Sequence, residues 1–238
     1  MPHEASSPSE DLSGWTARPV PPRTPMTGDR TRLEPVSVAT HGNALWEAVS
    51  QSEDPDQWTW LPYGPFADRD AFLAWLAERE ASVDPQFHAI VDAETGQAMG
   101  MCSFMRIDAA NGVLEIGHIW FSPAIQRSTI ATEAIFLLMR RTFDELGYRR
   151  LEWKCDNANV RSKRAAVRFG FTPEGVFRKH LVTKGRNRDT AWFSLLDDEW
   201  PANHAVFAAW LAPENFAEDG SQVRSLGEIR AAAGCGNP

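Results

Sequence analysis

The sequence has little of what marks secreted, membrane or metal-dependent proteins. Its 238 residues include three cysteines, Cys102, Cys155 and Cys235, an odd number without the spacing of metal ligands. Apolar runs stay well short of the roughly 18 residues that a membrane-spanning helix needs. The N-terminus also lacks the basic and then apolar pattern of a secretion signal. We therefore expect a cytoplasmic protein with no membrane partner, no disulfide framework and no metal.

An excess of basic residues is also missing. The chain carries 24 basic and 32 acidic residues, which gives a formal net charge of -8. General affinity for nucleic acid needs a basic surface, so we expect no nucleic-acid partner. The acidic balance is compatible with a cationic amine substrate. Aromatic residues, in contrast, are plentiful, and 10 Trp and 13 Phe predict aromatic-rich packing or an aromatic-lined pocket.

Composition divides the chain into an arm, one domain and a tail. Residues 1–30 are rich in Pro, Ser and Thr and predict a disordered or extended N-terminal arm. Residues 31–213 contain no linker and no internal repeat, so we expect a single domain that ends with a terminal helix over 199–211. Residues 214–238 predict a C-terminal tail that is weakly structured or lies on the surface.

Strands and helices are mixed along the domain. Periodicity and turn residues predict strands over 33–38, 87–91, 98–107, 113–121, 149–155, 172–179 and 190–196. Helices are expected over 41–52, after the N-cap Asp68, from Ser128 or Thr129 to Gly147, over 159–169 and over 199–211. This order indicates a mixed α/β, or α+β, domain.

The segment between Trp120 and Ala134 is the most informative. It predicts an apolar strand, a short turn and a helix that begins near Ser128 or Thr129. A helix start presents backbone N–H groups without partners and a partial positive charge, and this combination binds phosphate. Taken alone, the segment is equally well an ordinary connection between a strand and a helix.

Three motifs carry a resemblance to a known family over roughly residues 31–200. Gln126-Arg127-Ser128-Thr129-Ile130-Ala131 resembles the acyl-CoA signature Gln/Arg-x-x-Gly-x-Gly/Ala of the GCN5-related N-acetyltransferases (GNAT), with Thr129 in place of the usual glycine. Asn159-Val160-Arg161-Ser162, followed by Phe169-Gly170-Phe171, is similar to elements of the RimJ/RimL-like branch. Thr132-Glu133-Ala134 is also common in that branch.

The resemblance implies the GNAT fold, a twisted, mostly antiparallel central sheet flanked by helices and splayed between its fourth and fifth strands. It implies acetyl-CoA as cofactor and transfer of the acetyl group to an amine by direct attack in a ternary complex. The implied cofactor-binding residues are Trp120, Phe121, Gln126, Arg127, Ser128, Thr129, Ile130, Ala131, Thr132 and Asn159. Thr129 is allowed if its φ is negative, as at a helix start, and we predict this conformation.

Glu115 is the general-base candidate. It lies on the strand before the signature, seven residues before Ser122, where histone-acetylating relatives have their base glutamate. Strand alternation predicts that Glu115, Gly117, Ile119 and Phe121 share one face, and that Ile116, His118 and Trp120 share the other. A carboxylate among apolar residues can have a raised pKa and accept a proton. The alternative is a structural ion pair with Arg106 or Lys154.

Other candidates each have a structural alternative. His118 is a rival base or a core histidine, and Ser162 resembles the residue near the departing sulfur but could equally bond at a helix start. Asn159 orients the coenzyme or caps that helix. Cys155 is expected to be a buried thiol rather than a nucleophile, because no base is spaced to activate it.

The acceptor side is less defined by the sequence. Trp58, Trp60 and Tyr63, with Phe66, lie between the first two expected helices, where the fold covers the acceptor, and either bind it or form a packed plug. His180 and residues 186–189 belong to the late hairpin on the other side. The acceptor is a small molecule or a protein or peptide N-terminal amine, and a homodimer is compatible with the family. The rival function is a non-catalytic acyl-CoA-binding protein.

Overall fold

The computed structural model describes residues 11–234. Part of the expected arm, residues 1–10, and the end of the expected tail, residues 235–238 with Cys235, lie outside the described residues. Among the helices of the described part, none is both long and apolar enough to cross a membrane. The division of the chain near residues 30 and 213 stays a prediction.

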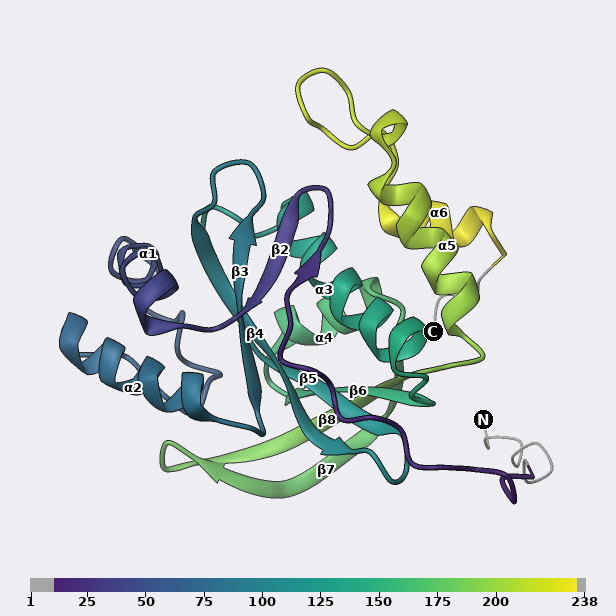
Figure 1. Ribbon diagram of the computed structural model, residues 1–238, viewed down its shortest axis with the longest axis horizontal. Coiled ribbons are helices and arrows are strands. Elements are labelled where there is room, and N and C mark those ends of the chain that lie inside the picture. The colour runs from purple at the N-terminus through teal and green to yellow at the C-terminus, as the bar shows by residue number, and fades with distance from the viewer. Residues whose placement is uncertain (1–10, 235–238) are drawn as a thin grey trace.

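The centre of the fold is an eight-stranded sheet (Figure 1). In spatial order its strands are β1 (Met26–Thr27), β2 (Thr31–Pro35), β3 (Gln86–Asp92), β4 (Ala98–Asp108), β5 (Val113–Phe121), β6 (Arg150–Asp156), β8 (Arg186–Leu196) and β7 (Thr172–Thr183). All neighbours are antiparallel except β5 and β6, which run parallel. The predicted mixed, mostly antiparallel sheet is confirmed.

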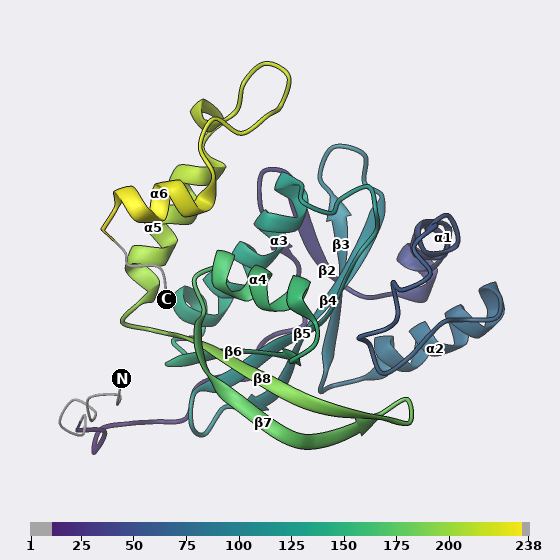
Figure 2. The ribbon, with the colours of Figure 1, turned by 180° about the vertical axis from the view of Figure 1, so that it is seen from behind.

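Helices cover both faces of this sheet, as Figures 1 and 2 show. On one side α1 (Val38–Ser50) and α2 (Arg69–Ala81) enclose a core that contains Leu45, Phe72, Leu76, Phe87 and Trp120. The other side carries α3 (Thr129–Arg140), which continues as the π-helical turn η1 (Arg141–Glu145), α4 (Val160–Arg168) and α5 (Trp200–Leu211). Their core includes Leu114, Ile116, Ile135, Leu151 and Phe207.

Parallel pairing between β5 and β6 stops almost as soon as it begins. Only Val113, Leu114 and Glu115 pair with β6, opposite Arg150 to Glu152, and the two strands then diverge. Because β1 precedes the expected first strand, these are the fourth and fifth strands of the sequence prediction. The predicted splay is therefore confirmed.

A bulge in β5 changes which side chains share a face. The register with β4 shifts between Met101 and Ser103, and His118 takes a φ of 50°, in the left-handed region. Ile119 consequently packs with Ile116 against the α3 side, whereas His118 contacts Phe87 of the other core. The predicted strict alternation is wrong from this point on, because the extra residue reverses it, and Glu115 and His118 share a face.

The described part of the arm lies extended against the domain. The carbonyl of Pro21 accepts a hydrogen bond from Gln86 Nε2 at 3.1 Å, and Tyr148 donates to the carbonyl of Pro19 at 3.1 Å. Arg141, on the π-helical turn, donates to the carbonyls of Thr24 and Pro25. Because proline has no N–H, this segment cannot form a continuous strand ladder, and its carbonyls instead accept hydrogen bonds from side chains of the domain.

The expected tail contains a helix. α6 (Leu226–Ala232) begins with a capping box between Ser225 and Glu228, and it buries Leu226 and Ile229 in the core beneath α5. Arg230 donates to Asn203 Oδ1 at 2.7 Å. The expectation of weak structure is therefore wrong for these residues. Overall composition does not show that Leu226 and Ile229 lie on one face of a short helix, and this face becomes buried only by packing with α5.

His88 on β3 is a buried titratable group beside the backbone of Gln86. Among the described residues, neither of its ring nitrogens has a hydrogen-bond partner, and the ring packs edge-on against Phe104. Burial, with the positive charges of Arg141 and Arg23, lowers the pKa of His88 to about 4.

His88→Phe should make the protein less sensitive to acid. The folded state keeps His88 neutral until about pH 4, whereas the unfolded chain takes up the proton below about pH 6.5. The contribution of neutral His88 to the free energy of unfolding is therefore fully present above pH 6.5. It falls by about 3 kcal/mol as the pH drops to 4. Urea unfolding at pH 7.5 and pH 5 should show a shallower loss in the variant, but not a flat one, because His118 has the same pKa shift. An unchanged pH slope contradicts this account.

Candidate active site

The start of α3 presents backbone amides without partners. Ser128 caps the helix, and its Oγ accepts from the Ala131 amide at 3.2 Å. The Thr132 amide donates to the Ser128 carbonyl. Within residues 11–234, the amides of Thr129 and Ile130 donate to no acceptor. Two adjacent free N–H groups at a helix N-terminus form a geometry that suits a phosphate.

The one left-handed residue of the loop before α3 is Arg127 and not Thr129. As predicted, Thr129 keeps a negative φ as the first helical residue, and the left-handed conformation falls instead on Arg127, with a φ of 61°. Gln126 Nε2 donates to the carbonyl of Phe121 at 3.3 Å, which holds the loop against the end of β5. The missing glycine of the signature is therefore compatible with this backbone.

The start of α4 lies beside the splayed end of β6. Asn159 caps the helix, because its Oδ1 accepts from the Ser162 amide at 3.0 Å. Ser162 Oγ accepts from Trp153 Nε1 at 2.9 Å. Burial raises the pKa of the Cys155 thiol and outweighs the opposite effects of the Ser162 hydroxyl and the positive charge of Arg188, which lower it. Cys155 is thus a buried, protonated thiol, as expected, and Ser162 lies close to it.

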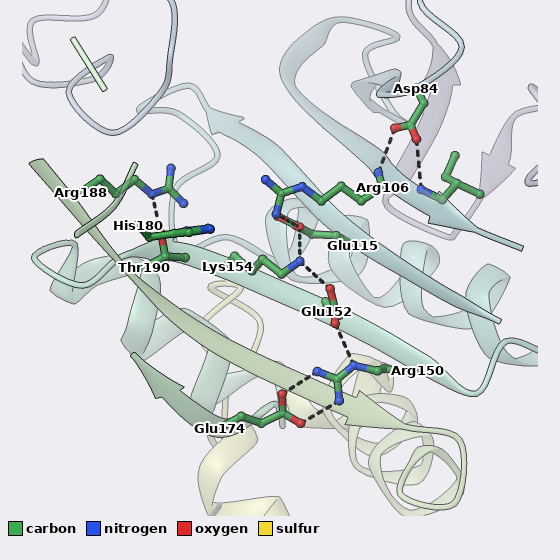
Figure 3. A network of polar contacts seen from close by, with 11 residues as sticks. Asp84, Arg106, Glu115, Arg150, Glu152, Lys154, Glu174, His180, Arg188 and Thr190 are labelled. Carbon is green, nitrogen blue, oxygen red and sulfur yellow. Dashed lines mark hydrogen bonds and ion pairs between the residues drawn. The ribbon is translucent and has the colours of Figure 1, made fainter. Parts of the chain in front are cut away.

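Glu115 belongs to a ladder of ion pairs (Figure 3). Its Oε2 lies 3.1 Å from Arg106 Nη1 and 3.0 Å from Lys154 Nζ. Lys154 also pairs with Glu152 at 2.6 Å, and Arg150 joins Glu152 to Glu174. Both ion-pair partners considered from the sequence are therefore present. Burial nevertheless raises the pKa of Glu115, against the charges of Lys154 and Arg106.

His118 lies in an aromatic wall on the same face. Its ring stacks on Tyr63 with 5.6 Å between centroids and contacts Phe87 at 4.9 Å. Among the described residues, His118 Nδ1 has no hydrogen-bond partner. Burial, with the charges of Arg79 and Arg106, lowers its pKa to about 4, so the ring is neutral at neutral pH.

The aromatic segment between α1 and α2 is packed and tied down. Trp58 is buried and stacks on Trp120, with 5.7 Å between ring centroids, while Trp60 is 40% exposed. Lys184, at the β7–β8 turn, donates from Nζ to the carbonyls of Trp58, Tyr63 and Gly64 at 2.8 to 2.9 Å. Trp58 therefore fits the packed plug, and the hairpin and this segment enclose one side of the site together.

Several residues at the site were not identified from the sequence. Lys184 ties the two walls together, and Trp192 lies under the Lys154 ammonium, 3.9 Å from ring centroid to Nζ. Thr190 Oγ1 bonds His180 Nδ1 at 2.9 Å and accepts from Arg188 Nε at 3.2 Å. Alternation along the late strand was the one available signal, because residues 188, 190 and 192 share a face.

Comparisons with known proteins agree with this geometry. Residues 30–172 match the family model described as an acetyltransferase (GNAT) domain. The crystal structure of a GCN5-related N-acetyltransferase from Brucella melitensis has 51% sequence identity and a TM-score of 0.90, and the match covers 92% of this chain and 100% of that one. A Chromobacterium violaceum structure, described as a probable acetyltransferase of the GNAT family, has 43% identity and a TM-score of 0.75 over 84% of this chain and 99% of that one.

A curated relative adds a more specific name. Over 105 residues the chain is 32% identical to a Bacillus subtilis protein named "Putative ribosomal N-acetyltransferase YdaF". The match covers 44% of this chain and spans 57% of the relative's length. It agrees with the resemblance to the RimJ/RimL-like branch. Since the family model covers more than half of the chain, and a solved relative matches 92% of it, this chain belongs to the GNAT family of N-acetyltransferases.

Proposed function

We propose that the protein transfers an acetyl group from acetyl-CoA to a primary amine, by direct attack of the amine in a ternary complex. The observation that carries the proposal is the divergence of β5 and β6 after Glu115, next to the free amides at the start of α3. Together they provide an opening between two strands, a phosphate-binding end and a buried carboxylate on the acceptor side.

Acetyl-CoA supplies an acetyl group activated as a thioester. The amides of Thr129 and Ile130 would bind its pyrophosphate, and exposed Arg127 adds positive charge. Beyond Glu115, no strand of the described residues pairs with the edge of β5 that faces β6, and this edge would be available to the amides of the pantetheine arm. A solved neighbour of the same fold, the microcin C7 self-immunity acetyltransferase MccE, is described in complex with acetyl-CoA and AMP.

Glu115 is the best-placed group to take a proton from the amine. Its raised pKa makes it a stronger base than an exposed glutamate, and Arg106 and Lys154 hold one carboxylate oxygen in place. His118 shares the face but is a weaker base, because its pKa is lowered to about 4. Ser162, near Cys155 at the splay, would donate a hydrogen bond from its hydroxyl to the departing thiolate and so stabilise its charge.

The acceptor would lie between the aromatic wall and the β7–β8 hairpin. A protein or peptide N-terminal amine is favoured by the name of the Bacillus subtilis relative. A small amine with an apolar part is favoured by the stacked rings of Tyr63 and His118, on the same face as Glu115, and by Trp192 beneath the Lys154 ammonium. The alternative of a protein that only binds acyl-CoA predicts the same coenzyme site without turnover.

Thiol release separates these functions. Acetyl-CoA should bind by calorimetry, and a panel of small amines and peptide N-terminal amines should then release free thiol and acetylated product. Binding without release by any amine would favour the binding-only alternative. Failure to bind acetyl-CoA at all would contradict the proposed coenzyme site.

Thr129→Pro should weaken coenzyme binding without unfolding the helix. Proline is favoured at the first helical position, and Ser128 before it is already extended, with φ -91° and ψ 171°. The substitution removes one N–H that would bind phosphate, so we expect the Kd for acetyl-CoA to rise about tenfold. Thr129→Ala, which keeps the N–H, should bind as the wild type does. Equal affinity of the proline variant would exclude this amide from the site.

Glu115→Gln should slow turnover at neutral pH and leave acetyl-CoA affinity unchanged. Because the pKa of Glu115 is raised, the wild-type rate should fall with decreasing pH at a midpoint above the usual glutamate range, and the variant should lose this limb. Glu152→Gln is the matched control, since it also breaks an ion pair with Lys154. Similar slowing in both variants, with the pH limb kept, would indicate a structural role.

A further inference from the structure

We propose that the acceptor amine carries its own anionic group, a carboxylate or a phosphate, and that Arg188 binds this group together with Arg106. This inference rests on the proposed function, because it concerns the acceptor side of the same site. It identifies Arg188 as the residue that determines acceptor specificity.

Arg188 on β8 is a half-buried cation without an anion. Among the described residues, no carboxylate lies within ion-pair distance of its guanidinium, and neither Nη group donates a hydrogen bond. Its neighbour in sequence, Asp189, instead accepts from the Lys179 amide and from Asn187. A guanidinium that is partly removed from water and unpaired is suited to bind an anionic ligand.

The guanidinium of Arg188 is oriented by its neighbours. Nε donates to Thr190 Oγ1 at 3.2 Å, and the same oxygen is bonded to His180 Nδ1 at 2.9 Å. Thr190 itself is buried. These two hydrogen bonds orient the plane of the Arg188 guanidinium and leave its Nη groups free. A bidentate contact with a carboxylate or phosphate requires this arrangement.

Arg106, on β4, is a second arginine with free donors. Within residues 11–234 only its Nη1 donates a side-chain hydrogen bond, to Glu115, and the side chain is 48% exposed. In the view of Figure 3, the side chain of Arg106 points toward Glu115 and that of Arg188 lies next to His180 and Thr190, with the two guanidinium groups directed toward each other. An anion bound between them would place an attached amine near the Glu115 carboxylate.

Arg188 differs from the other cations of this network in being unpaired. Arg106 and Lys154 pair with Glu115, and Arg150 pairs with Glu152 and Glu174. Among the described residues, Arg188 pairs with no carboxylate and is therefore the cation available to an anionic ligand. The amides proposed for the coenzyme phosphates start α3, which packs on the opposite face of the sheet from Glu115.

Matched acceptor pairs test the inference in the complete protein. The pairs are phenylalanine and phenylalaninamide, O-phosphoethanolamine and ethanolamine, and peptides with Glu or Gln as second residue. In at least one pair, kcat/KM should be about tenfold or more higher for the anionic member. In the phenylalanine pair this preference is opposite to the one expected from amine protonation. The amine of phenylalaninamide is less basic, so a larger fraction of it is neutral and able to attack at neutral pH. The pair that responds tells carboxylate from phosphate.

Variants assign the preference to Arg188. Arg188→Gln should raise KM for the anionic acceptor about tenfold while leaving kcat/KM for the neutral member unchanged. Arg188→Lys should keep part of the preference. Arg186→Gln removes an exposed charge from the same hairpin and should change nothing. The Kd for acetyl-CoA should be the same in all of them.

Each contrary result has one meaning. Equal kcat/KM within every pair, or a preference that survives in Arg188→Gln, overturns the inference and leaves the proposed function intact. Weaker acetyl-CoA binding in Arg188→Gln assigns the residue to the coenzyme and also overturns it. If Arg188→Gln does not fold, the KM ratio of Arg188→Lys decides instead. Absence of thiol release with every amine, despite bound acetyl-CoA, overturns the proposed function itself.

Discussion

The site depends on one constraint, that β5 is paired with β4 along most of its length and with β6 for only three residues. The left-handed φ of His118 lets β5 bulge at this point, so the strand turns away from β6 without losing its partner on the other side. The same bulge brings His118 to the face of Glu115. A strand that lies open in the middle of a sheet, rather than at its edge, is enclosed by helices on both sides.

Charge is concentrated where the strands separate. Glu115, Glu152 and Lys154 are largely removed from water, and each has at least one opposite charge within 3.1 Å. Such a network is costly to leave incomplete, because removal of one partner leaves a buried charge uncompensated. The network therefore fixes Glu115 in place while burial raises its pKa. Structural and catalytic roles are compatible here, since the position of a base depends on the contacts that hold it.

Much of the fold followed from local pattern. The strand Val113–Phe121, the helix start after Ser128, the N-cap Asp68 and the helix stop at Gly147 lie where turn and capping residues predict them. The candidate site was predicted less completely. Glu115 and its two ion-pair partners were recognised, whereas Lys184, Trp192 and the contact of Arg188 with Thr190 were not, because they join segments far apart in the chain.

The sequence by itself determined the elements that depend on neighbouring residues: the helix start at Thr129 with its free amides, the turns and the mixed order of strands and helices. Only the tertiary structure decided the bulge at His118, the helix Leu226–Ala232 and the contacts of Arg188 and His180 with Thr190. The physical reason is the range of the forces involved. Caps and turns are set by hydrogen bonds within a few residues, whereas faces, burial and charge balance are set by packing between distant segments.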